Sequence, residues 1–307
     1  GSVTSVLPDG RGRIWVTSAL GQGCGSTAWV AGVVQAHSWL LSHFPEQGQD
    51  DVYGANPDAV VAAVILPRGK AVRTADGFRL EGVWPFGSGC ERSEWLLLGA
   101  MVFDADGNAI DQGDFIVPTS SVTLKDDWFV SGLAGTGSCT MVVDGLDVPA
   151  HRFLSLPGLI SGNSPGANLH NDDWVVRCAP VPVLTIALCG GAIGIAKQAL
   201  ADFPSAIKGK TIAYTADPQD GHSFTHIRLG DAASRIREGE LLLYGVADEL
   251  DATAQAGGEV PRLRRAEMRN DCAVAVRRLL EGVEILFRES GATGVRTSSP
   301  INRALAD

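Results

Sequence analysis

The sequence predicts an α+β chain with an N-terminal helical domain, a middle antiparallel β-barrel or sandwich, and a C-terminal four-helix bundle. Three observations support this prediction: apolar residues at helical spacing before Pro45, short β-type runs separated by turns between about Ala59 and Pro149, and long amphipathic stretches after Val181. The expected boundaries are 1–58, 59–150 and 151–307.

The first helical stretch is "GSTAWVAGVVQAHSWLLSHF", which begins with a Ser26-Thr27 start signal. Apolar residues then recur at helical spacing, and Pro45 is expected to end the helix.

Short strands are predicted in the middle of the chain. "AVVAAVIL" is a β-type apolar run, and "KAVRTADGFRLEGVW" predicts a hairpin with Asp76-Gly77 as its turn. "WLLLGAMVFDADGNAID" repeats the pattern around Asp106-Gly107, and "DFIVP", "WFVSGL" and "TMVVDGLDVP" are expected to be further strands. Regularly spaced short strands are typical of a small sandwich or barrel.

The last part of the chain predicts helices near 182–203, 224–257 and 261–290. In the second, apolar residues recur at i, i+3, i+4 and i+7 with charges between them. Helices of this length usually pack in bundles and often form subunit interfaces.

The composition is that of an acidic globular chain: 307 residues, 45% hydrophobic, 20% charged, with a formal net charge of −10. This charge argues against nucleic acid or an anionic membrane as the main partner. No Rossmann or P-loop glycine pattern is present. The stretch closest to a membrane span, "VPVLTIALCGGAIGIAKQAL", contains paired glycines that suit a tightly packed helix.

The six cysteines predict neither a metal site nor disulfides, because no two have CxxC spacing and no histidine lies near one. Scattered among apolar residues, they are expected to be buried free thiols in a reducing, cytoplasmic compartment. They are Cys24, Cys90, Cys139, Cys178, Cys189 and Cys272.

Residues 82–95, "GVWPFGSGCERSEW", place two aromatic rings and a hydroxyl close together. In a regular strand Trp84, Phe86 and Ser88 share one face, while Gly87 and Gly89 let the backbone approach a ligand. Such a face could form the wall of a pocket for a flat molecule. Spacing alone favours the simpler alternative, a core turn.

Two further features have both a structural and a functional interpretation. "GLAGTGSC" (132–139) could expose backbone N–H groups to a ligand, or could be an ordinary glycine-rich turn. His37 lies among apolar residues on its helix, so the residues alone favour a satisfied core histidine.

Four stretches resemble one known family. They are "CGSTAWVAGVVQAHSWL", "GFRLEGVWPFGSGCERSEWLLLG", "VSGLAGTGSCTMVVDGLDVPAHR", and the pair "GGAIGIAKQAL" and "SSPINRALAD". Together with the helix–β–helix order, they resemble the acyl-CoA dehydrogenase fold. Within it they are similar to the two-component flavin-dependent monooxygenases, such as 4-hydroxyphenylacetate hydroxylase oxygenases and dibenzothiophene monooxygenases. The resemblance covers nearly the whole chain.

The resemblance implies an oxygenase component that receives reduced FMN or FAD by diffusion from a separate flavin reductase. With O₂ as co-substrate, the reduced flavin would form a C4a-hydroperoxide that hydroxylates an electron-rich aromatic molecule, in catabolism or natural-product tailoring. A homotetramer is also implied.

The resemblance also implies roles for particular residues. It places Ser88 near flavin N5 as a catalytic group and His37 in the substrate pocket, where it acts on the proton of the substrate. The other implied flavin contacts are Trp84, Phe86, Gly89, Thr136, Gly137 and Ser138. No metal is expected.

Three departures accompany the resemblance. Ala62 and Ala63 stand in the substrate-pocket strand where many phenol-hydroxylating relatives have serines, so the substrate is expected to differ or to bind in another pose. The family pattern also predicts additional residues before Ile14, and a helix with an active-site histidine beyond Asp307.

Two other functions stay open on sequence alone. An acyl-CoA dehydrogenase or oxidase would need a carboxylate base beside the flavin. A flavin-free binding or scaffold protein could keep the same fold.

Overall fold

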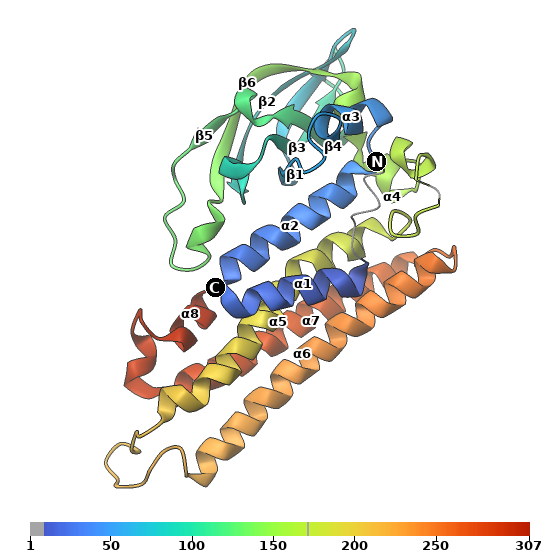
Figure 1. Ribbon diagram of the computed structural model, residues 1–307. Coiled ribbons are helices and arrows are strands. Elements are labelled where there is room, and N and C mark those ends of the chain that lie inside the picture. The colour runs from blue at the N-terminus through green and yellow to red at the C-terminus, as the bar shows by residue number, and fades with distance from the viewer. Residues whose placement is uncertain (1–8, 171) are drawn as a thin grey trace.

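The computed structural model describes residues 9–170 and 172–307. In Figure 1 a β-sheet lies at one end of the molecule and α2 runs beneath it, above the other long helices. The helices before the sheet are α1 (Gly10–Gly23), α2 (Gly25–Leu41) and α3 (Glu46–Tyr53). Those after it are α4 (Leu156–Ile160), α5 (Pro180–Ile207), α6 (Ser223–Gln255), α7 (Arg262–Glu289) and α8 (Pro300–Ala306).

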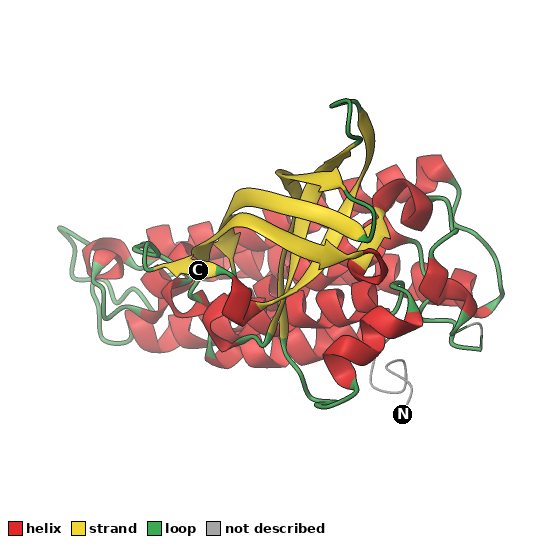
Figure 2. Ribbon diagram, turned by 90° about the horizontal axis from the view of Figure 1, so that it is seen from above, coloured by secondary structure: helices red, strands yellow, loops and turns green. Residues whose placement is uncertain are grey.

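The strands form one mixed sheet in the order β5-β6-β2-β1-β3-β4-β7, which lies over the middle of the helical part when viewed from above (Figure 2). Their bounds are β1 Val61–Arg73, β2 Gly77–Gly87, β3 Trp95–Phe103, β4 Ala109–Pro118, β5 Thr123–Lys125, β6 Cys139–Pro149 and β7 Phe153–Ser155. Both Asp-Gly hairpins are confirmed, since β1 pairs antiparallel with β2 and β3 with β4. The expectation of a purely antiparallel sheet is wrong, because β1 and β3 are parallel.

The parallel pair follows from a short crossing at one end of the sheet. Strand β2 returns toward the beginning of β1, and residues 88–94 cross that end so that Trp95 starts β3 opposite Val61. Glu94 fastens the crossing: its N–H donates to the Val60 carbonyl, and its carboxylate accepts the Val60 N–H at 2.8 Å. Ser88 and Gly89 therefore lie in the crossing segment at the end of the sheet.

The predicted strand "WFVSGL" (128–133) is not part of the described sheet. These residues form a loop instead. The Trp128 indole N–H donates to the Leu133 carbonyl at 3.2 Å. Leu133 itself has φ +53°, a left-handed conformation that cannot continue a strand.

The predicted helix that begins at Ser26-Thr27 is confirmed as α2, and a separate helix, α1, precedes it. Cys24 between α1 and α2 is extended, with φ −159°, and α2 ends at Leu41 instead of continuing to Pro45. Cys24 is exposed, so the expectation of a buried thiol is wrong for it, whereas the other five cysteines are buried and free.

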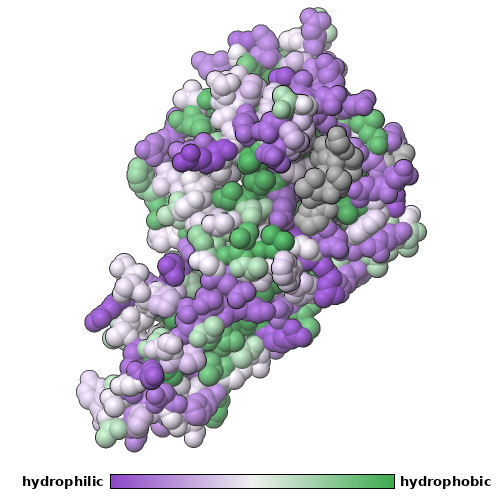
Figure 3. Space-filling view, viewed as in Figure 1, coloured by the Kyte–Doolittle hydropathy of each residue, from purple (hydrophilic) through white to green (hydrophobic). Residues whose placement is uncertain are grey.

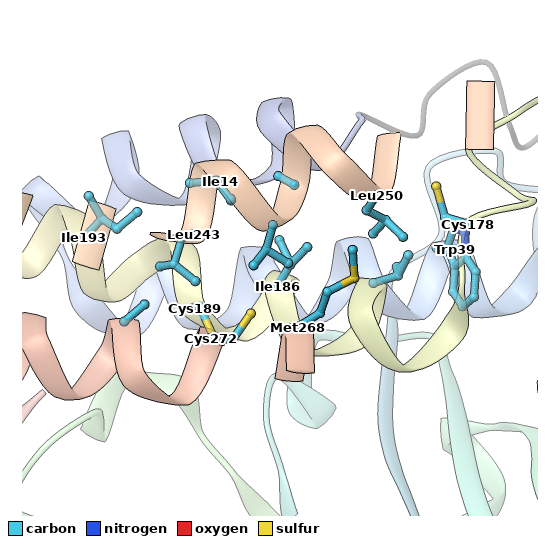
Figure 4. Close-up of a cluster of buried hydrophobic side chains, with 14 of the residues drawn as sticks. Ile14, Trp39, Cys178, Ile186, Cys189, Ile193, Leu243, Leu250, Met268 and Cys272 are labelled. Atoms are coloured by element: carbon cyan, nitrogen blue, oxygen red, sulfur yellow. The ribbon is translucent and has the colours of Figure 1, made fainter. Parts of the chain in front are cut away.

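The three predicted C-terminal helices are confirmed as α5, α6 and α7, and α1 packs along α5 in the same core. Figure 4 shows this core, in which Ile186, Leu243 and Met268 meet. Gly32 allows α2 to approach α5 closely, because a Cβ there would lie 2.4 Å from the Ala187 carbonyl oxygen. Helix α5 is thereby held between α1, α2 and α7.

Within the described residues, α5 is the one helix whose length and composition would allow it to cross a membrane. More than half of its most apolar stretch is buried against other elements of the chain, as expected for the core helix of a bundle.

Candidate functional site

A cavity of about 240 Å³ lies where α2, the start of β1, the end of β2 and α5 meet. On the face shown in Figure 3, hydrophobic side chains gather between the sheet and the long helices. The cavity wall is mostly apolar, with four residues that carry polar side-chain atoms. The lining residues are Trp29, Val33, Ala36, His37, Ala63, Val64, Ile65, Leu66, Arg68, Pro85, Phe86, Ser88, Leu184 and Leu188.

Helix α2 brings Trp29, Val33 and His37 to the cavity because they are spaced four residues apart and lie on one helix face. Sequence reasoning selected His37 and missed Trp29. The same spacing could have identified Trp29, since it lies two helical turns before the histidine.

Ser88 lies at the centre of a chain of hydroxyl groups. The Trp29 indole N–H donates to Ser88 Oγ at 3.0 Å, and Ser88 Oγ is 2.8 Å from Ser138 Oγ. Ser138 Oγ is in turn 2.6 Å from Thr136 Oγ1. The two stretches selected from the sequence, 82–95 and 132–139, therefore meet side by side. Thr136 and Ser138 are buried behind Ser88 and are not among the cavity-lining residues.

The two glycines of this junction have conformations that favour glycine. Gly89 has φ +77° and Gly137 φ +52°. The Gly89 N–H donates to the Thr136 carbonyl at 2.8 Å, which joins the crossing segment to the 132–139 loop.

The expectation that Trp84, Phe86 and Ser88 share one face is wrong. Trp84 is fully buried in the core of the β-sheet, and its indole N–H donates to the Gly99 carbonyl at 2.7 Å. Phe86 has φ +69°, which breaks the strand alternation, and its side chain is 65% exposed at the cavity. Phe86 and Ser88 therefore reach the cavity, while Trp84 does not.

His37 is a neutral hydrogen-bond acceptor toward the cavity. Its Nδ1 lies 2.8 Å from the Val61 carbonyl, which can only accept, so Nδ1 carries the proton. Burial lowers the pKa of His37 to about 4, so the ring is uncharged near neutral pH and Nε2 has a free lone pair. A molecule with an O–H or N–H group could donate to it.

Ala62 and Ala63 point to opposite faces of the sheet. Ala63 lines the cavity, as predicted for a pocket residue, whereas Ala62 packs into the β-sheet core, so its placement in the pocket is wrong. The physical reason is the strand alternation of β1. Sequence reasoning also missed Arg68, which lies at the cavity in the irregular part of β1 between Val64 and Gly69.

These groups fit a flavin ring. Phe86 offers an aromatic surface, and Ser88 supplies a fixed hydroxyl beside it. Among the described residues, no cluster of three or more histidine, cysteine or acidic side chains is arranged to hold a metal ion.

Comparison with known proteins gives consistent results. The family model "Acyl-CoA dehydrogenase, C-terminal domain" matches residues 186–307. The flavin-dependent monooxygenase oxygenase subunit HsaA of Mycobacterium tuberculosis is 32% identical over 95% of this chain and 74% of its own length. The oxygenase component of an FADH(2)-dependent resorcinol hydroxylase from Rhizobium sp. is 33% identical over 94% of this chain and 72% of its own length.

Solved structures give the same picture. The HsaA crystal structure from M. tuberculosis superposes with a TM-score of 0.89 at 30% identity, covering 100% of this chain and 81% of that one. XiaF from Streptomyces sp., solved in complex with FADH2 and glycerol, has a TM-score of 0.89 at 28% identity and covers 97% of this chain and 75% of that one.

Proposed function

Because the chain belongs to the oxygenase components of the flavin-dependent monooxygenases, on the acyl-CoA dehydrogenase fold, we propose that it hydroxylates an electron-rich aromatic small molecule with externally supplied reduced flavin and O₂. Reduced FMN or FAD, when bound, supplies the electrons that activate O₂, so that one oxygen atom enters the substrate and the other leaves as water.

One observation carries the proposal: His37, Ser88 and Trp29, from the helical and β parts of the chain, open onto one apolar cavity. Its aliphatic wall excludes water from the reacting groups and accepts a flat aromatic ring. Ser88 is held beside the flavin position, and His37 Nε2 accepts a hydrogen bond from a substrate hydroxyl or amine.

The cavity wall also bears on the substrate class. Ala63 adds no hydrogen-bond donor, so orientation of the substrate depends on His37 and Arg68. The described lining residues include no Asp or Glu, so this cavity does not supply the carboxylate base that the acyl-CoA dehydrogenase alternative needs.

The proposal extends to the partners and the assembly. A separate flavin reductase delivers the reduced flavin by diffusion in a reducing cytoplasmic compartment, where the free cysteines persist. The functional unit is a homotetramer with four-helix bundles at its centre. Large apolar side chains exposed on α6 and α7, among them Ile227, Leu241 and Leu263, support a subunit interface there.

The test combines reduced-flavin binding with isotope incorporation. The protein is titrated anaerobically with photoreduced FMN or FAD and then mixed with ¹⁸O₂ and a panel of phenols and indoles. We expect saturable binding of reduced flavin and a product that carries one ¹⁸O atom. Failure to bind reduced flavin, or label absent from every product, would overturn the proposal.

Ser88→Ala is expected to raise the fraction of consumed O₂ that is released as H₂O₂, because the fixed hydroxyl beside the flavin is lost. Peroxide and hydroxylated product are quantified after a single turnover. Ser120→Ala, at an exposed serine that does not line the cavity, is the matched control. Unchanged coupling in Ser88→Ala would remove Ser88 from the catalytic groups.

A further inference from the structure

We propose that a one-way chain of hydroxyl groups makes Ser88 a pure hydrogen-bond acceptor, and that this selects reduced over oxidised flavin. The inference rests on the proposed function for the position of the flavin. It assigns Thr136 and Ser138 as positioning residues that act through Ser88 without touching the cofactor.

The direction of the hydrogen bonds in this chain of hydroxyl groups is set at Thr136. Its hydroxyl lies 2.8 Å from the Leu133 carbonyl, and a carbonyl can only accept, so the single Thr136 hydroxyl proton points to Leu133. Thr136 Oγ1 can then only accept from Ser138, which lies 2.6 Å away.

Each hydroxyl has one proton to donate, so the direction of the hydrogen bond at Thr136 also fixes the direction at Ser138 and Ser88. Ser138 donates its one proton to Thr136, so it must accept from Ser88 at 2.8 Å. Ser88 donates its one proton to Ser138 and accepts the Trp29 indole N–H at 3.0 Å. One lone pair of Ser88 Oγ is left for a bound molecule, and no proton.

The anchor of the chain is rigid. Leu133 is held in the left-handed conformation, and its carbonyl also accepts the Trp128 indole N–H at 3.2 Å. Its N–H donates to the Asp307 carboxylate at 2.8 Å, which ties the loop to α8. The Leu133 carbonyl therefore keeps its position, and the Thr136 proton has a fixed acceptor.

The family resemblance implies that Ser88 faces flavin N5, and there an acceptor-only Ser88 discriminates between the two redox forms. Reduced flavin carries a hydrogen on N5 and can donate to the free lone pair. Oxidised flavin has a lone pair on N5, so two acceptors would face each other with no proton between them.

Thr136→Val tests the direction of the chain. Without the threonine hydroxyl, Ser138 can donate to Ser88, and the Ser88 proton is then free to turn to a bound molecule. We expect oxidised FMN or FAD to bind about tenfold more tightly than in the wild type, so that the ratio of oxidised to reduced Kd falls by about tenfold. Thr136→Ser keeps the hydroxyl and should retain the wild-type ratio.

The measurement is flavin fluorescence for the oxidised form and anaerobic absorbance titration for the reduced form. Ser138→Ala also frees the Ser88 proton, and gives a second reading if Thr136→Val does not fold. The proposed hydroxyl chain is overturned if a folded variant keeps the wild-type ratio of oxidised to reduced Kd, or if it binds both flavin forms more weakly by the same factor. Wild-type protein that binds no reduced flavin instead overturns the proposed function itself.

An analogue locates the effect at N5. Oxidised 5-deazaFAD and 5-deazaFMN have C–H in place of N5, which removes the opposing lone pair. We expect wild-type protein to bind the oxidised 5-deaza form more tightly than the matching oxidised flavin, and Ser88→Ala to abolish that difference. If wild-type protein binds the oxidised 5-deaza form and the matching oxidised flavin with equal affinity, the proposed hydroxyl chain is contradicted.

Discussion

At about pH 9, Asp114→Asn is expected to raise the free energy of unfolding by several kcal/mol, while at about pH 4 it changes stability little. Asp114 lies on β4, is 3% exposed, and its Oδ1 has no hydrogen-bond partner among the described residues. Burial raises the pKa of its carboxyl from 3.8 to about 8.

The sign of the pH dependence follows from this raised pKa. The folded protein holds the Asp114 proton more tightly than the unfolded chain does, so the contribution of this group to stability is complete below about pH 4. It is lost as the pH rises toward about 8, the pKa in the folded protein. Each pKa unit corresponds to about 1.4 kcal/mol, so the loss is on the order of 5 kcal/mol.

Asparagine has nearly the shape of aspartic acid and cannot ionise, so the variant escapes this loss. Urea unfolding curves of both proteins are compared at about pH 4, 7 and 9. Asp106→Asn, the same substitution at an exposed carboxylate in the β3–β4 turn, is the matched control. A stability difference between wild type and Asp114→Asn that is constant with pH would contradict the prediction.

The parts of the fold that were predictable depend on local signals. Asp-Gly turns set both hairpins, and apolar periodicity identified the three long C-terminal helices. These signals are contained within each segment, so they do not require knowledge of the partner.

What the sequence did not predict depends on contacts between distant segments. The parallel pairing of β1 and β3 requires the crossing at 88–94, which Glu94 holds through Val60. No local propensity encodes this parallel pairing.

The candidate site shows the same division. The stretches 82–95 and 132–139 and His37 could be selected from residue types and a family resemblance. The structure joins the two stretches through Ser88 and Ser138, and it places His37 at the same cavity as Ser88. The hydrogen bond from Trp29 and the position of Arg68 were not predictable, because they depend on how the irregular parts of the strands face α2. The placement of Ala62 in the sheet core follows from the alternation of β1, which is a local signal.

Trp84→Ala and Phe86→Ala are expected to affect different properties, stability and flavin binding respectively, although the two residues lie two positions apart on one strand. Trp84→Ala should lower the free energy of unfolding by about 3–5 kcal/mol, since it empties a fully buried site and leaves the Gly99 carbonyl without its donor. A Cβ on Gly69 would lie 2.2 Å from the indole, which shows how closely the sheet packs on it.

Phe86→Ala should lower stability by less than about 1 kcal/mol, because the ring is 65% exposed. It should weaken reduced-flavin binding, since the ring forms part of the cavity wall at a left-handed residue where a bulky side chain is uncommon. Urea unfolding measures the first effect, and anaerobic titration of the folded protein measures the second. If the folded Trp84→Ala protein lost more flavin affinity than Phe86→Ala, the indole would have to reach the ligand, and its assignment to the sheet core would be wrong.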